Sequence, residues 1–153
     1  MKEIWGPTIA GVATAVVIGI LAWLDQINGQ LALIMAPFGA SAVLIFGLPE
    51  SPLAKAKNVI GGHFVTAFIG VLFTEYLTVS PITLALATGL AVTTMLVTKT
   101  THPPAGANPM VIMLSGQSWL FILFPVLVGA MTLVAGGKVC RLLSNQLKTK
   151  SAN

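Results

Sequence analysis

Long apolar stretches separated by short polar connections dominate the chain. Five of them have the length or hydrophobicity expected of membrane helices: Ile4–Leu24, Leu31–Leu48, Val59–Leu77, Ile82–Val97 and Leu120–Val139. A sixth stretch, about His102–Gly116, is shorter and begins with polar residues. A transmembrane helix needs about 20 predominantly apolar residues, so the pattern predicts an all-α integral membrane protein. We expect one domain over residues 1–153, with a cytoplasmic tail at 146–153.

The composition agrees with a membrane protein and excludes the common soluble classes. Hydrophobic residues make up 56% of the chain and charged residues 8%, which is too few to cover a soluble domain. The formal net charge of +4 comes from sparse cations in short connections, a pattern that does not indicate nucleic-acid binding. We therefore expect membrane lipids, and no nucleic acid, among the partners of the chain.

The positions of the charged residues favour six crossings. If all six stretches cross, the basic residues fall on one side: Lys2, Lys55, Lys57, Lys99, Lys138, Arg141, Lys148 and Lys150. Asp25 and Glu75 then fall near the other side. The positive-inside tendency places both termini in the cytoplasm. The alternative is four full spans plus two re-entrant segments, which puts Lys55 and Lys57 outside and weakens the charge bias.

A nine-residue pattern occurs twice within the apolar stretches. Pro37–Ile45 (PFGASAVLI) returns as Pro104–Ile112 (PAGANPMVI). Ser41 and Asn108 occupy equivalent places and are favoured N-caps, so each copy predicts a helix that starts inside the membrane. Three crossings per half, about residues 1–78 and 79–145, make the second half run in the opposite sense. The sequence thus predicts an inverted 3+3 repeat with two broken helices, as in many transporters.

The two predicted helix starts form a candidate site for a small anion. In an inverted repeat, the half-helices after Ser41 and Asn108 aim their positive ends and free backbone N–H groups at a common point. The adjoining repeat positions leave the backbone open to a ligand: Gly39, Ala40, Gly106 and Ala107. Alternatively, these small residues only allow close helix packing. Nitrite, nitrate, formate and chloride fit two helix ends equally well.

Both histidines of the chain are functional candidates. His63 follows two glycines near the start of the third stretch, and His102 stands at the entrance to the second break. A histidine inside a membrane can donate to an anion or carry a proton. For His102 the alternative is that it is a loop residue whose side chain forms a hydrogen bond with the backbone at a proline-rich bend. Thr66 and Thr101 are further candidate contacts for a ligand.

No catalytic or cofactor chemistry is predicted. Two histidines without nearby carboxylates are a weak basis for a zinc site, which normally takes three protein ligands, and a single cysteine, Cys140, allows no intramolecular disulfide. The sequence shows no phosphate-binding loop, acidic dyad or nucleophile beside a base. We therefore expect no metal, no other cofactor and no enzyme activity.

Four ordered motifs resemble the HPP family of integral membrane proteins, which is named for its His-Pro-Pro motif. They are Ala36–Ala42, Pro49–Ala54, Asn58–His63 and His102–Ala107, and the similarity extends over essentially the whole chain. The family is usually described with four transmembrane helices. Its plant and cyanobacterial members are associated with nitrite transport, in plants across the chloroplast envelope. Some relatives carry cytoplasmic CBS domains, which this sequence lacks.

The resemblance implies a transporter or channel for a small monovalent inorganic anion, nitrite or nitrate, with nitrite favoured. Its motifs place substrate binding at Pro37–Ser41, His63 and His102–Asn108. The alternative is a non-transporting oligomeric membrane scaffold or sensor. We expect a bacterial inner-membrane protein, of cyanobacterial or other origin. Six short spans leave little room for a pore within one copy, so we also expect a homo-oligomer such as a dimer.

Overall fold

Helices form most of the described chain. The computed structural model describes residues 2–28 and 33–150, and these ranges contain no strand. The elements are, in chain order, α1 (Lys2–Asn28), α2 (Pro37–Ala42), the π-helix η1 (Val43–Gly47), the 3-10 helix η2 (Pro52–Ala54), α3 (Ala56–Tyr76), α4 (Pro81–Val97), the 3-10 helix η3 (Pro103–Ala107), α5 (Asn108–Ser115), the π-helix η4 (Ile122–Leu127) and α6 (Val128–Lys150). Because η1 continues α2 and η3 leads into α5, we write these pairs as α2–η1 and η3–α5.

The helices of the chain differ in length. Three helical segments are long and apolar enough to cross a membrane: Gly6–Ile27, Ala56–Tyr76 and Ile122–Gln146. α4 has 17 residues, and α2–η1 is shorter still. With 1.5 Å per residue, α2–η1 is about 16 Å long, roughly half of the hydrocarbon core of a bilayer. The chain is therefore an all-α membrane protein that contains short, interrupted segments.

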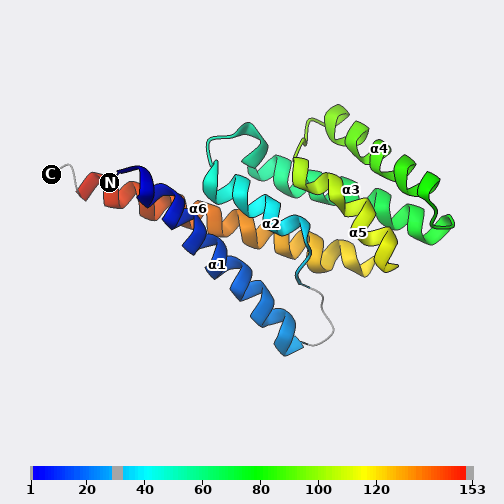
Figure 1. The fold of residues 1–153 in the computed structure, drawn as a ribbon, viewed down its shortest axis with the longest axis horizontal. Coiled ribbons are helices and arrows are strands. Elements are labelled where there is room, and N and C mark those ends of the chain that lie inside the picture. The colour runs from blue at the N-terminus through cyan, green and yellow to red at the C-terminus, as the bar shows by residue number, and fades with distance from the viewer. Residues whose placement is uncertain (1, 29–32, 151–153) are drawn as a thin grey trace.

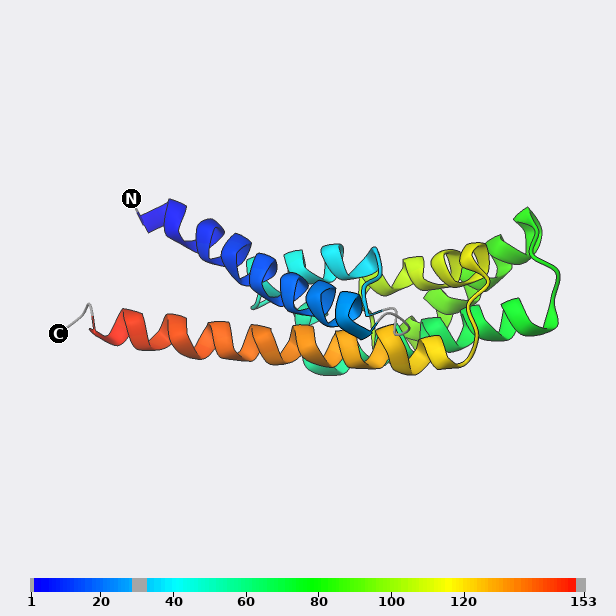
Figure 2. The same cartoon turned by 90° about the horizontal axis from the view of Figure 1, so that it is seen from below.

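The two short helices begin in the interior and run in opposite directions. In Figure 1, α2–η1 and η3–α5 both start near the middle of the long axis; the first runs toward the chain termini and the second away from them. The perpendicular view in Figure 2 shows the same opposition. Each half of the chain has one short helix between two longer ones. This is the inverted arrangement that the sequence predicts.

Basic residues gather at one end of the molecule. α1 begins and α6 ends at this end, and the start of α3 and the end of α4 point the same way (Figure 1). We call it the basic end; Lys55, Lys138 and Arg141 line one hollow there, and Lys57 follows in the first turn of α3. Arg141 pairs there with Glu50. The arrangement follows the six-segment prediction, in which Lys55 and Lys57 lie on the side of the termini.

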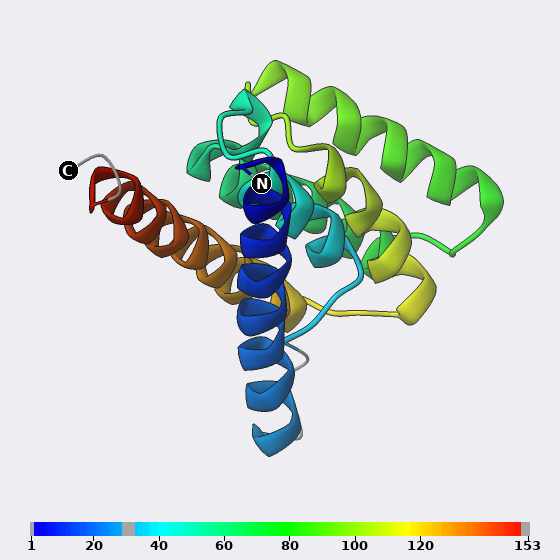
Figure 3. The same cartoon turned by 60° about the vertical axis from the view of Figure 1, so that its left-hand side comes forward.

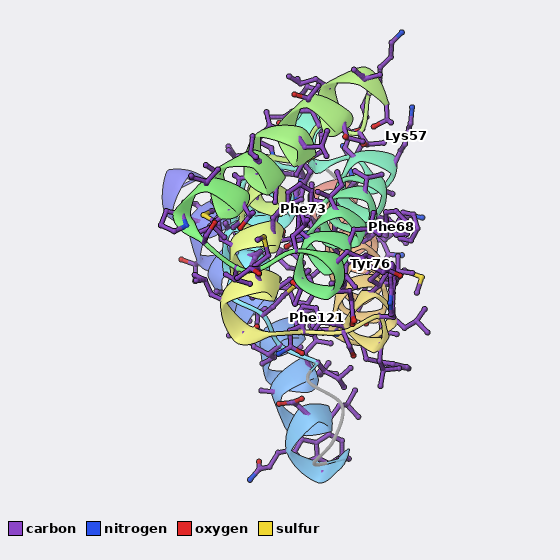
Figure 4. The ribbon with its side chains drawn as sticks, turned by 90° about the vertical axis from the view of Figure 1, so that its right-hand side faces the viewer. Lys57, Phe68, Phe73, Tyr76 and Phe121 are labelled. Carbon is purple, nitrogen blue, oxygen red and sulfur yellow. The ribbon has the colours of Figure 1, made fainter. Side chains whose placement is uncertain are left out.

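α3 is the central helix, and α1 is peripheral. α3 contacts α4, α5, η3, η4 and α6. Figure 4 shows Phe73 on the side of α3 that faces α4 and Phe68 on the outer side, where its ring centroid is 5.7 Å from that of Trp119. α1 crosses α6 (Figure 3). Within its apolar segment Gly6–Ile27, only 11% of the most hydrophobic 18-residue stretch is buried. The remaining apolar surface of α1 is suited to contact with lipid.

A glycine on α6 makes room for the ring of Phe38 in α2. Phe38 has no exposed surface, and a Cβ atom at position 129 would lie 2.1 Å from its ring. Gly136 and Gly137 similarly receive Val17 of α1 and Ile45 of η1. Small residues allow this close approach in membrane helices, where dispersion contacts hold the bundle together. α6 of the second half thus fixes the position of α2 in the first.

We predict that Gly129→Ala destabilises the fold, because the added methyl group would overlap Phe38. Overpacking of this kind costs about 1–3 kcal/mol. Thermal unfolding in detergent would report the loss as a lower midpoint. Gly89→Ala in α4 is the matched control, since a Cβ atom there meets nothing within 4 Å and alanine favours a helix. Equal midpoints for the two variants would contradict the packing of α2 against α6.

Candidate functional site

The first short helix begins at Pro37, before the predicted start at Ser41. Proline favours the first helical position, because its φ is preset and it lacks an amide hydrogen that would have no helical partner. Ser41 therefore lies inside the helix, where its Oγ is 3.1 Å from the carbonyl oxygen of Pro37. The prediction that Ser41 is an N-cap is wrong. Its hydroxyl faces the protein interior instead.

The second break is a 3-10 turn that leads into α5, and not a capped start. η3 begins at Pro103, and α5 follows from it with no side-chain cap bond. Asn108 has helical torsion angles, φ −58° and ψ −46°, and is the first residue of α5. The prediction that Asn108 is an N-cap is therefore also wrong, because the 3-10 turn starts the helix earlier. The side-chain amide of Asn108 is left for other partners.

Backbone amides contribute less to this site than the sequence suggests. The prolines that open the two short helices carry no N–H group, and the amides of Phe38, Gly39 and Ala105 already donate to turn carbonyls. The positive ends of the two helix dipoles still lie close together. The polar groups at their meeting point, however, belong mainly to side chains.

Five polar side chains meet between the two halves and form what we call the buried cluster. They are Ser41 of α2, His63 and Thr66 of α3, His102 before η3, and Asn108 of α5, each with 0% exposure. Oγ of Ser41 lies 2.9 Å from Nε2 of His63 and 2.9 Å from Nε2 of His102. One hydroxyl therefore joins the first repeat motif, the central helix and the His-Pro-Pro motif.

Glycine at position 62 allows the His-Pro-Pro segment to reach α3. A Cβ atom on Gly62 would lie 2.7 Å from the carbonyl oxygen of Thr100 and 3.0 Å from Cβ of His102. Gly61 is equally restricted, with Thr100 Cγ2 at 2.8 Å from its would-be Cβ. The glycine pair before His63 therefore brings both imidazole rings into one place. Their centroids are 5.1 Å apart at an interplanar angle of 60°.

The hydrogen-bond partners of Asn108 fix the orientation of its amide. Nδ2 lies 3.1 Å from the carbonyl oxygen of His63 and 3.0 Å from Oγ1 of Thr66. Thr66 in turn donates to the carbonyl oxygen of Gly62 at 2.8 Å. Exchanging the amide oxygen and nitrogen would place two carbonyl oxygens against each other, so Nδ2 is the group that faces α3. Oδ1 is buried and has no hydrogen-bond partner.

The surrounding groups assign a different tautomer to each histidine. Nδ1 of His63 is 3.1 Å from Nδ2 of Asn108, which is a donor, so this ring carries its hydrogen on Nε2 and donates to Ser41. Nδ1 of His102 is 2.8 Å from the carbonyl oxygen of Leu53, so this ring donates from Nδ1 and accepts from Ser41 at Nε2. The bonds run in one direction, from Asn108 through both rings to Leu53.

The buried cluster is closed in this structure. The ring of Phe38 stands edge-on to His63, with centroids 5.5 Å apart and an interplanar angle of 78°. Phe38 is itself held against Gly129 of α6. A hollow of about 450 Å³ lies elsewhere, at the basic end between α1, η1 and α6. Access from either side to the buried cluster thus requires Phe38 or the short helices to move.

The predicted site residues divide into two groups. Ser41, His63, His102 and Asn108 come together as side chains, and Pro37 contributes its carbonyl oxygen. The remaining four lie outside the cluster: Gly39 and Ala40 are exposed, and Gly106 and Ala107 are half-buried. Of the two candidate threonines, Thr66 belongs to the cluster, whereas Thr101 is only half-buried. The buried cluster therefore contains only some of the residues of the two repeat motifs.

The carbonyl oxygen of Leu53 is the partner that the sequence did not indicate. Leu53 belongs to η2, and its oxygen anchors His102. Every residue carries such an oxygen, so residue type gives no signal for it. The only hint was the position of Pro49–Ala54 among the four ordered motifs.

Comparisons with known proteins bear on the family of the chain. The family model described as HPP, transmembrane region, matches residues 2–150. The chain belongs to the HPP transmembrane family. Two curated transmembrane proteins of Dictyostelium discoideum are each 32% identical to it over 142 residues, or 88% of the chain. The chain spans about half the length of these relatives, 50% and 46% respectively. No solved structure matches it significantly.

We predict that the two histidines of this HPP protein occupy opposite neutral tautomers. Nitrogen-15 solid-state NMR of histidine-labelled protein in lipid should show one ring protonated at Nε2 and one at Nδ1, because Asn108 and Leu53 impose different roles. The chain contains only these two histidines, so His63→Gln assigns both signals. Two rings with the same tautomer would contradict the hydrogen-bond directions described above.

Proposed function

We propose that this HPP-family protein is a transporter or channel for a small monovalent anion, with nitrite as the favoured substrate. The observation that carries the proposal is the meeting of two oppositely directed short helices at a buried polar cluster. Interrupted helices of this kind, in an inverted arrangement, are typical of transport sites near the bilayer midplane. The preference for nitrite over nitrate comes only from the family resemblance.

The buried cluster supports this proposal because polar groups are costly in such a position. Among the described residues, the buried polar side chains are Ser41, His63, Thr66, His102 and Asn108 of the cluster, together with Thr100. Polar and ionisable groups inside a membrane are rare and mark ion pathways or ligand sites. The positive ends of α2 and η3–α5 add a potential that favours negative charge. A small anion fits both features.

Topology and assembly complete the proposal. We place the basic end in the cytoplasm of a bacterial cell, because cytoplasmic connections carry an excess of Lys and Arg. Both termini then lie inside.

We also propose a homo-oligomer, such as a dimer, since short helices in one copy enclose little space for a pore. Lipid or a second copy would cover the exposed apolar side chains of α1, which include Val12, Val16 and Trp23.

The closed state of the buried cluster favours a second candidate function. All five of its side chains have 0% exposure, as expected for a network that only fixes the packing of the two halves. In that case the protein is an oligomeric membrane scaffold or sensor. A transporter would have to open the cluster, whereas a scaffold would keep it shut. Uptake measurements separate the two candidates.

We predict that purified protein in liposomes takes up nitrite faster than protein-free liposomes. Asn108→Ala should reduce the protein-dependent rate about tenfold, because it removes the amide that holds His63 and Thr66 in place, and leaving buried partners unsatisfied costs about 1–3 kcal/mol. Thr93→Ala is the matched control, since this exposed hydroxyl of α4 bonds only its own helix, at Gly89. Size-exclusion chromatography checks that each variant is folded. If nitrite, nitrate, formate and chloride all fail to enter under imposed gradients, the transport proposal is wrong and the scaffold or sensor is the remaining candidate function.

A further inference from the structure

The buried cluster contains no fixed positive charge to balance an anion. None of the buried polar side chains in the described part of the chain is Lys or Arg. An isolated charge in an apolar interior is strongly unfavourable unless an opposite charge accompanies it. Only the two imidazole rings of the cluster can become positive near neutral pH. A bound anion therefore calls for a proton on one of them.

His102 can accept this proton without any heavy atom moving. In the neutral state the Ser41 hydroxyl donates to Nε2 of His102, at 2.9 Å. The carbonyl oxygen of Pro37 is a second acceptor for the same hydroxyl, at 3.1 Å. When Nε2 of His102 gains a proton, the hydroxyl can turn to Pro37 and accept from His102. Every hydrogen then still has an acceptor, because Nδ1 of His102 continues to donate to Leu53.

His63 is poorly placed to take the proton. Its free position is Nδ1, which faces the donor Nδ2 of Asn108 at 3.1 Å. A hydrogen on this atom would point at another hydrogen. Turning the Asn108 amide over would then set its oxygen against the His63 carbonyl oxygen, now 3.1 Å from Nδ2. The two rings therefore have different roles despite their contact with the same hydroxyl.

The groups that contact His102 carry no permanent charge, so the bound anion decides whether its ring is protonated. His63 of α3 faces it, and the closest groups of α2 and η2 are the Ser41 hydroxyl and the Leu53 carbonyl oxygen. The lysines on the elements packed against it are exposed: Lys55, Lys57 and Lys99. Among the described residues, no carboxylate is buried with it.

We propose that His102 is the proton-binding group of the site, and that each anion crosses together with one proton. This inference rests on the proposed transport function and specifies its coupling. A proton and an anion enter from one side, His102 holds the proton as an imidazolium while the anion is bound, and both leave on the other side. The net charge moved is zero.

The test uses the full chain in liposomes loaded with a pH-sensitive dye, with nitrite as the probe. Potassium gradients with valinomycin set the membrane potential, and protein-free liposomes give the passive leak of nitrous acid, which is subtracted. The expected result is protein-dependent uptake that does not depend on the membrane potential and that delivers one proton to the lumen with each nitrite. Uptake driven by an inside-positive potential without acidification would overturn the coupling. Absence of uptake would instead remove the proposed transport function.

Two variants assign the proton to His102. His102→Gln can keep the hydrogen bonds to Leu53 and Ser41 but cannot hold a proton. The uptake that remains in this variant should therefore not show the rise in rate at low pH that the wild type shows. His63→Gln should be slower than wild type yet keep that rise. In nitrogen-15 NMR at fixed pH, saturating nitrite should doubly protonate the His102 ring and leave His63 neutral. Protonation of His63 instead, or an unchanged pH profile in His102→Gln, would overturn the assignment.

Discussion

The hydroxyl of Ser41 is the interaction on which the centre of this protein depends. It lies 2.9 Å from an imidazole nitrogen of His63 and of His102, and so joins a short helix of the first half to the His-Pro-Pro segment of the second. A buried polar group is stable only when its partners are complete, and this one hydroxyl completes both rings. Without it, each ring would face the interior with an unpaired nitrogen.

Glycines make this contact possible by removing side chains where backbones must approach. Gly62 admits the segment that carries His102, and Gly129 admits the ring of Phe38, which covers His63. The glycines therefore serve packing, and the polar chemistry belongs to the residues that they bring together. This explains why Gly39, in the first repeat motif, stands in open space while Gly62, outside both motifs, is closely restricted.

Much of this architecture could be predicted from the sequence, because hydrophobic length and repeat symmetry act over many residues. The all-α class and the opposed short helices followed from these patterns, the family followed from four ordered motifs, and four of the proposed site residues do meet. The N-cap predictions for Ser41 and Asn108 failed because proline starts each short helix earlier, a local competition that residue preference alone did not resolve. The Leu53 carbonyl oxygen could not be predicted, since a backbone atom leaves no mark in the sequence.

A double-mutant cycle on Ser41→Ala and His102→Ala tests most directly whether one shared hydroxyl joins the two halves. The free energy of unfolding in detergent micelles would be measured for the wild type, both single variants and the double variant. Residues in contact typically couple by about 0.5–3 kcal/mol, and we expect a value in that range. Effects that simply add, to within about 0.5 kcal/mol, would show that Ser41 and His102 do not interact and would contradict this account.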